Sequence, residues 1–162
     1  GRDLPACPSG ILQRGELCCE GKQMSAVPFE SAAMFLLDAL DNSSASSMSM
    51  DLFGLPLKFS LSIQDASVPG GTISLSSGVV EERVTLHGDV SFSVDIGLPV
   101  VGENAMLICA RFAGTVIEEL LRAPRARSHY VRNASLGGIL ERGTPTGAVP
   151  LWEIRLGVSV SM

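Results

Sequence analysis

The clearest pattern in the chain is an alternation of apolar and polar residues between positions 80 and 98. The apolar side chains fall on even positions, at Val80, Val84, Leu86, Val90, Phe92, Val94, Ile96 and Leu98. This alternation predicts extended chain with one face buried and the other in water. Because a strand rarely exceeds about ten residues, we expect an interruption around residues 87 to 89, either a hairpin turn or a bulge.

Weaker alternation predicts four further extended segments. Residues 57 to 63 and residues 152 to 160 each place apolar side chains on every second position, so each predicts a half-buried strand. A short strand at residues 73 to 75 is expected after the break at residues 69 to 71, and residues 130 to 140 form a less regular extended stretch.

Two segments, residues 28 to 40 and residues 105 to 121, repeat apolar residues every three or four positions, which predicts a helix at each. The second helix is expected to have about nineteen residues and to end at Pro124. Glu103 and Asn104 precede the second helix, where their side chains can accept hydrogen bonds from free backbone amides. Cys109 falls on the apolar stripe of that helix. The serine-rich residues 41 to 50 show no period and predict a flexible loop.

Together these elements predict an α+β fold, a mostly antiparallel sheet with two helices packed on one face. We expect one domain over residues 28 to 162, preceded by a poorly ordered arm over residues 1 to 27. An alternative interpretation takes Met24 as the natural start, with the preceding residues foreign to the protein.

Composition supports one folded domain and narrows the set of partners. The chain has 162 residues, of which 46% are hydrophobic and 18% charged, enough apolar material for a core. Its net charge of −5 does not match a nucleic-acid backbone or an anionic membrane, so we expect neither as a direct partner. No apolar run approaches the roughly eighteen residues of a membrane-spanning helix.

The search for reactive chemistry gives no candidate site. Cysteines stand at Cys7, Cys18, Cys19 and Cys109 without paired CxxC spacing, which argues against zinc. We expect reduced thiols, although four cysteines could form two disulfides. His87 and His129 have no spaced ligand partner and are expected to be exposed loop residues. We therefore predict a protein that is not an enzyme and has no cofactor and no metal.

The order of elements resembles one known family. The segments "VTLHGDVSFSVDIGL", "ENAMLICARFAGTVIEELL" and "GTPTGAVPLWEIRLGVSVSM" look like the tail-terminator and minor capsid proteins of long-tailed bacteriophages. The corresponding residues are the helix opener Asn104-Ala105, the Leu-rich turn Leu120-Leu121 and the aromatic Trp152. The resemblance covers residues 28 to 162.

The resemblance implies a structural virion protein, assembled in the host cytoplasm, that forms a ring, commonly a hexamer. Such a ring caps the tail tube, stops its growth and joins tail to head, so the implied partners are further copies and other tail or connector proteins. The candidates for subunit contact are Arg83, Thr85, His87 and Asp89 on the expected hairpin, and Arg122, Arg125, Arg127 and Arg132 in the basic cluster.

Two alternatives stay open. A basic cluster beside Tyr130 could contact phosphate, although a solvated loop explains it more simply. The fold could also hold a small ligand, as a binding module or an enzyme with a pocket between the sheet and the helices.

Overall fold

The computed structural model describes residues 28–61, 68–82, 86–126, 128–142 and 151–162. The chain divides into a unit of residues 1–31 and a unit of residues 32–162, and the packing described below is that of the second unit. Its elements are the helices α1 (Pro28–Asp41), α2 (Ala45–Phe53) and α3 (Ala105–Leu121) and the strands β2 (Lys58–Ser60), β3 (Gly70–Glu82), β4 (Leu86–Leu98), β5 (Tyr130–Arg142) and β6 (Leu151–Ser161).

The five strands form one sheet in the order β2-β3-β4-β6-β5. β3 pairs antiparallel with β4, β4 with β6 and β6 with β5, but β2 pairs parallel with β3. The sheet is therefore mixed, and the prediction of a mostly antiparallel sheet is wrong. Alternation fixes which face a side chain occupies but carries no information on the direction of the neighbouring strand, which is why the pattern did not show the parallel pair.

The prediction of two helices is also wrong, because the described residues contain a third, α2, within the segment expected to be a loop. Ala45 and Ser49 are buried, and Met48 and Phe53 pack against the core. The Ser49 hydroxyl donates a hydrogen bond of 2.7 Å to the carbonyl oxygen of Leu55. A serine with its hydroxyl satisfied in this way takes the place of an apolar residue on the inner side of α2, so the helical period is hidden in the sequence.

The strands around the predicted interruption differ from the expectation. Residues 87 to 89 lie within β4, and the ladder between β3 and β4 runs from Gly70↔Gly97 to Glu82↔Leu86. The prediction of an interruption at residues 87 to 89 is therefore wrong. β3 and β4 do pair as two neighbouring antiparallel strands, but residues 83 to 85 between them lie outside the described residues. β3 is also longer than the short strand expected at residues 73 to 75, and it continues through residues 76 to 78 by means of a register shift between Leu75 and Ser77.

At the other predicted elements the agreement is closer. α1, α3, β5 and β6 occupy the expected segments, whereas β2 has only three residues and residues 62 to 67 lie outside the described residues. Asn104 does stand at the start of α3, but its side chain makes no capping hydrogen bond. The domain boundary at residue 28 stays a prediction.

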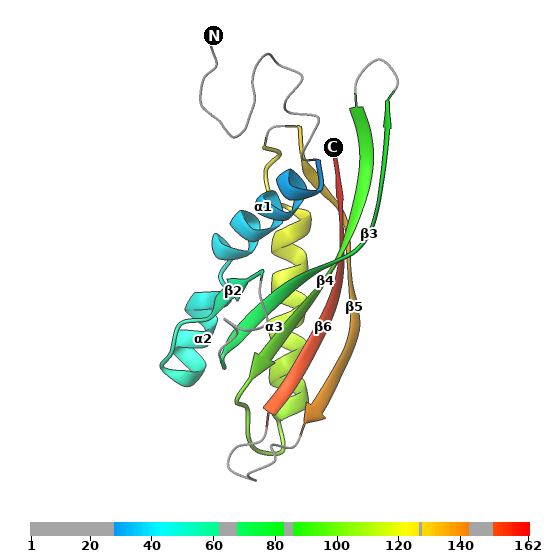
Figure 1. The fold of residues 1–162 in the computed structure, drawn as a ribbon. Helices are drawn as coiled ribbons and strands as arrows, with labels where there is room; N and C mark the ends of the chain where they lie inside the picture. Colours follow the sequence, from blue (N-terminus) through cyan, green and yellow to red (C-terminus); the bar gives the residue numbers. More distant parts are fainter. Residues whose placement is uncertain (1–27, 62–67, 83–85, 127, 143–150) are drawn as a thin grey trace. The chain divides into compact units, whose positions relative to one another are not determined.

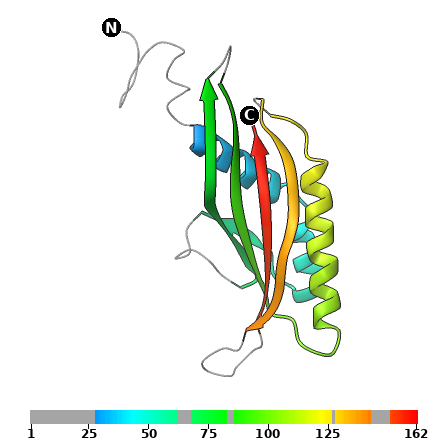
Figure 2. The ribbon, with the colours of Figure 1, turned by 90° about the vertical axis from the view of Figure 1, so that its right-hand side faces the viewer.

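The core lies between the helices and one face of the sheet. α3 and the part of α1 from Ala32 onward lie on the same side of the sheet (Figures 1 and 2). Because directly paired residues of antiparallel strands share a face, the even positions of β4 and β6 form one apolar surface. The fully buried side chains at this surface and on the facing helices include Val90, Val94, Ile96, Ile154, Leu156, Leu36, Phe112 and Val116.

Candidate assembly surface

The face of the sheet opposite the helices carries polar side chains on every strand that crosses it. In the part of the chain that the structure describes, no helix covers this face (Figure 1). We call this surface the open face. It consists of the odd positions of β4 and β6 and of the residues of β3 and β5 that pair with them. The residues that define it are Asp89, Ser91, Ser93, Asp95, Asn133, Ser135, Glu153, Arg155, Gly157, Ser159 and Ser161.

Asp89 links three strands on the open face. Its carboxylate accepts a hydrogen bond from the Ser161 hydroxyl on β6 and forms an ion pair with Arg132 on β5, with 2.8 Å between Oδ2 and the guanidinium nitrogen. Asp89 and Arg132 come from the two different segments that the sequence singled out, and the fold brings them together. This contact is made within one copy of the chain, so both charges are satisfied without a partner subunit.

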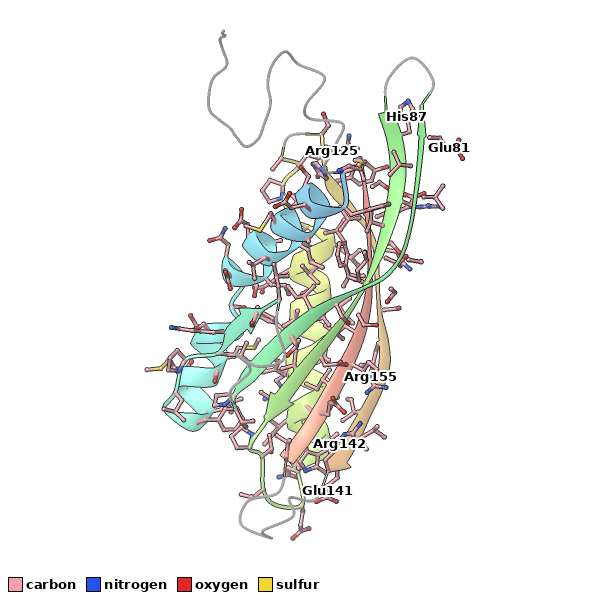
Figure 3. The ribbon with its side chains drawn as sticks, in the orientation of Figure 1. Glu81, His87, Arg125, Glu141, Arg142 and Arg155 are labelled. Carbon is pink, nitrogen blue, oxygen red and sulfur yellow. The ribbon has the colours of Figure 1, made fainter. Side chains whose placement is uncertain are left out.

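A second charge network crosses the open face at its other end. Arg155 on β6 pairs with Asp95 on β4 at 3.0 Å and with Glu153 at 3.6 Å, and Glu153 in turn pairs with Arg142 on β5 at 2.6 Å. Figure 3 shows Arg142 and Arg155 beside each other on this side of the sheet. The two networks together contain three carboxylates and three arginines, so their charges balance.

Serine hydroxyls fill the space between the two networks. The hydroxyl oxygens of Ser76 and Ser93 lie 3.1 Å apart, and those of Ser91 and Ser159 lie 3.3 Å apart. Each pair joins neighbouring strands through a hydrogen bond. A side chain on Gly157 would touch the hydroxyl of Ser135. The middle of the open face therefore carries small side chains, most of which end in a hydroxyl group.

The hairpin of β3 and β4 reaches beyond its neighbour β6. β4 pairs with β6 from Asp89 onward, and Met162 exchanges two backbone hydrogen bonds with Gly88, while His87 has a paired residue only on β3. His87 is exposed there, as expected, but it belongs to a strand and not to a loop (Figure 3). Arg83 and Thr85, two of the expected contact residues, lie outside the described residues.

The basic cluster does not form a single patch. Arg122, which follows the last residue of α3, pairs with Glu118 of that helix at 3.4 Å, and the guanidinium of Arg125 lies 4.3 Å from the centre of the Tyr130 ring. Arg132 points to Asp89, and Arg127 lies outside the described residues. Each described arginine of the cluster therefore contacts a different group, which does not favour a shared phosphate site.

His129 is buried, so the expectation of an exposed loop residue is wrong. Its ring stacks on Phe35 of α1, with ring centres 5.7 Å apart. Ala126 and His129 exchange two backbone hydrogen bonds across a tight turn in which Ser128 has a positive φ of 70°. The turn directs the chain from the end of α3 into β5, and it places the imidazole inside the structure.

Glu119 of α3 contacts the residue that precedes α2, a contact that the sequence pattern did not predict. The Glu119 carboxylate accepts hydrogen bonds from the backbone N–H of Ser44 at 2.9 Å and from the Ser44 hydroxyl at 2.6 Å. Ser44 precedes the first residue of α2, so a side chain from another helix satisfies an amide that the helix itself leaves free. A contact between residues 75 positions apart leaves no signal in a local pattern.

Two titratable groups are shifted by their surroundings. Burial raises the pKa of the Cys109 thiol from 9.0 to about 11, so the thiol keeps its proton at neutral pH. Burial, with the charge of Asp38 as a smaller cause, raises the pKa of Asp41. Neither group is part of the open face.

The described part of the chain contains no group of three or more His, Cys, Asp or Glu residues that could hold a metal ion. Among the same residues, no helix has both the length and the apolar character needed to cross a membrane.

No protein-family model and no curated protein matches the chain. Eighteen chains of solved structures match it. One is a chain of the "Virion of native gene transfer agent (GTA) particle", which is 11% identical with a TM-score of 0.42, the match covering 77% of this chain and 90% of that chain. At this identity and TM-score the match does not assign a function.

Proposed function

We propose that this chain is a structural protein of a phage-like virion, and that it acts as a tail terminator does, by forming a closed ring at the end of a tail tube. The proposal includes that the chain catalyses no reaction, uses no cofactor and is assembled in the host cytoplasm. Its partners are further copies of itself and other proteins of the tail or of the connector between head and tail.

The observation that supports this proposal is the difference between the two faces of the sheet. One face is buried under helices, and the open face carries hydroxyls and charges that are paired within the chain. A ring of such domains with the open faces turned inward would have a passage lined by hydroxyls and balanced charges. Nucleic acid could pass along that lining without being held, because binding a phosphate backbone requires a net positive surface.

The alternative of a ligand pocket between sheet and helices receives no support from the described residues. That space is occupied by buried apolar side chains, among them Leu36, Ile96 and Phe112. We therefore do not propose a binding module or an enzyme.

The experiment that tests the proposal is a mass measurement of the purified chain over a wide range of concentration, together with electron microscopy. One closed oligomer and annular particles are expected. The ring should also bind the ends of tubes formed by a tail-tube protein encoded in the same genome and stop their growth. A chain that stays monomeric at the highest concentration and binds no tube would contradict the proposal.

A further inference from the structure

The sheet has two long borders along which no other described strand pairs. On one side, β2 pairs only with Gly70, Gly71 and Thr72 of β3, so among the described strands none pairs with this border of β3 from Ile73 onward. On the other side, β5 is an outer strand along its whole length. Figure 2 shows β3 and β5 at the two borders. A strand border of this kind is a template for pairing with another chain.

The strand directions suit contact between one border and the other. β3, β4, β6 and β5 follow each other through three antiparallel pairings, so β3 and β5 run in opposite directions. A second copy related by rotation about an axis along the strands has its β5 antiparallel to the β3 of the first. Repeating this contact in the same sense closes a ring.

The exposed segments of the two borders also match in length and in their position along the strand direction. Ile73 is aligned through Val94 and Leu156 with Leu136, and Val79 is aligned through Asp89 and Ser161 with Tyr130. Each of the two segments, 73 to 79 and 130 to 136, contains one register shift. A neighbour placed without displacement along the axis therefore sets the two segments side by side over their full length.

Apolar side chains are exposed at both borders. In a contact without displacement Leu75 faces Ala134, two positions from Leu136, so the two leucines become diagonal neighbours. Leu75 on β3 is 54% exposed and Leu136 on β5 is 48% exposed, although both lie on the same face as the core. At Val79, which is 59% exposed on the open face, the aligned residue of the neighbour is Tyr130. Contact between the borders would cover all four side chains, which removes apolar surface from water.

At each end of the sheet, the β3 border and the β5 border carry side chains of opposite charge. At one end, β3 carries Glu81, and Arg125 lies just before β5 (Figure 3). At the other end, Lys58 on β2 is aligned with Leu140, and the next residue of β5 is Glu141. An antiparallel contact between the borders therefore brings an acid to a base at both ends, whereas the reverse direction would not.

We propose that residues 73 to 79 of β3 in one copy pair antiparallel with residues 130 to 136 of β5 in the next copy, so that the sheets of all copies join into one continuous barrel. This inference rests on the proposed ring and specifies the surface through which the ring closes. The occupant of each border is a second copy of this chain.

The test uses disulfide formation between copies, in a chain with Cys7, Cys18 and Cys19 replaced by serine. Ser77 and Asn133 are both exposed on the open face and lie at the same level, opposite Ser91 and Ser159. In the proposed contact their Cβ atoms come within the range that a disulfide spans. The double variant Ser77→Cys with Asn133→Cys is expected to give, on oxidation, a ladder of covalent multimers that ends at the ring mass, and each single variant is expected to stay uncrosslinked.

The possible results separate this inference from the proposed function. A ring by native mass spectrometry without crosslinking in the double variant would overturn the inference and leave the function in place. A covalent dimer of the Ser77→Cys single variant would show a two-fold contact between β3 strands and would also overturn the inference. Monomers alone at high concentration would overturn both.

A second pair of variants tests the same contact without cysteine. Leu75→Lys places a charge at the proposed contact and is expected to abolish the ring while the circular dichroism spectrum stays unchanged. The matched control is Leu107→Lys, because Leu107 is 66% exposed on α3 and not at a sheet border. Equal ring formation by the two variants would overturn the inference.

Discussion

The carboxylate of Glu119 in α3 holds Ser44 at the start of α2 through two hydrogen bonds, one to the backbone N–H and one to the hydroxyl. α2 has nine residues, too few to be stable alone, so it depends on contacts such as this one. The bond to the backbone N–H has the same effect as a capping side chain, but it is supplied from outside the helix.

Glu119→Ala should therefore destabilise the protein by about 1 to 2 kcal/mol, because it leaves the Ser44 amide without its acceptor. The matched control is Glu118→Ala, which removes an exposed pair with Arg122 and should cost less than about 0.5 kcal/mol. Urea denaturation of both variants measures the difference. Equal losses would mean that the contact between α2 and α3 does not contribute.

Substitution by alanine should have opposite effects on stability at two glycines, Gly88 and Gly114. A Cβ on Gly88 would collide with the carbonyl oxygen of Val79 across the hairpin, and Gly114 on α3 has open space around it. Gly88→Ala should lower the free energy of unfolding by about 1 to 3 kcal/mol through this clash. Gly114→Ala should raise it by about 0.5 to 1 kcal/mol, because alanine is the better helix former. Thermal denaturation distinguishes the two, and a neutral Gly88→Ala would argue against the observed register of the hairpin.

Burial of the Cys109 thiol should make the folded protein less stable at alkaline pH. The thiol ionises near pH 9 in the unfolded chain, but burial raises its pKa to about 11 in the folded protein. Between these values the unfolded chain binds fewer protons, so the free energy of unfolding falls as the pH rises from about 9 to about 11. Below about pH 9 the thiol is protonated in both states and contributes no pH dependence.

The measurement compares the chain that carries Cys109 alone with its Cys109→Ala variant, by urea denaturation at about pH 8 and about pH 10.5. The stability advantage of the cysteine chain should be smaller at the higher pH. The same thiol should react slowly with alkylating reagents in the folded state, because it is buried and protonated. A stability difference that does not change with pH would refute the assigned burial.

The ion pair of Asp89 and Arg132 predicts a small, salt-dependent coupling. Both side chains are about half exposed, so a double-mutant cycle with Asp89→Asn and Arg132→Gln should give about 0.2 to 1 kcal/mol. The coupling should decrease between about 0.05 and 1 M salt. Asp89→Ala should cost more than Arg132→Gln, since alanine also removes the acceptor of the hydrogen bond from Ser161. The reverse order of the two losses would contradict the role of Asp89 as the common partner.

Much of the sheet could be predicted because its two central strands obey a strict period of two. β4 and β6 each have apolar side chains on even positions, and these residues pair with one another on the buried face of the sheet. The continuation of β3 was predictable in principle. Ile73 and Leu75 are odd and Val80 is even, yet all three lie on the same face, which requires one extra residue between them.

The remaining features depend on contacts between distant segments, which a local pattern does not contain. The parallel pairing of β2 with β3 is a matter of strand direction, and the burial of His129 follows from its stacking on Phe35. Among the candidate contact residues, the sequence marked Asp89 and Arg132 separately. Their pairing needs the alignment of Tyr130 with Ser161 and of Ser161 with Asp89, which exists only in the folded sheet.

β4 lies between β3 and β6, and its odd and even positions belong to different surfaces. Adding or deleting one residue in the middle of β4 would exchange those surfaces over the rest of the strand, sending valines to water and aspartates to the interior. Variation in natural sequences of this fold should therefore preserve the length of β4 more strictly than the identities of its odd residues.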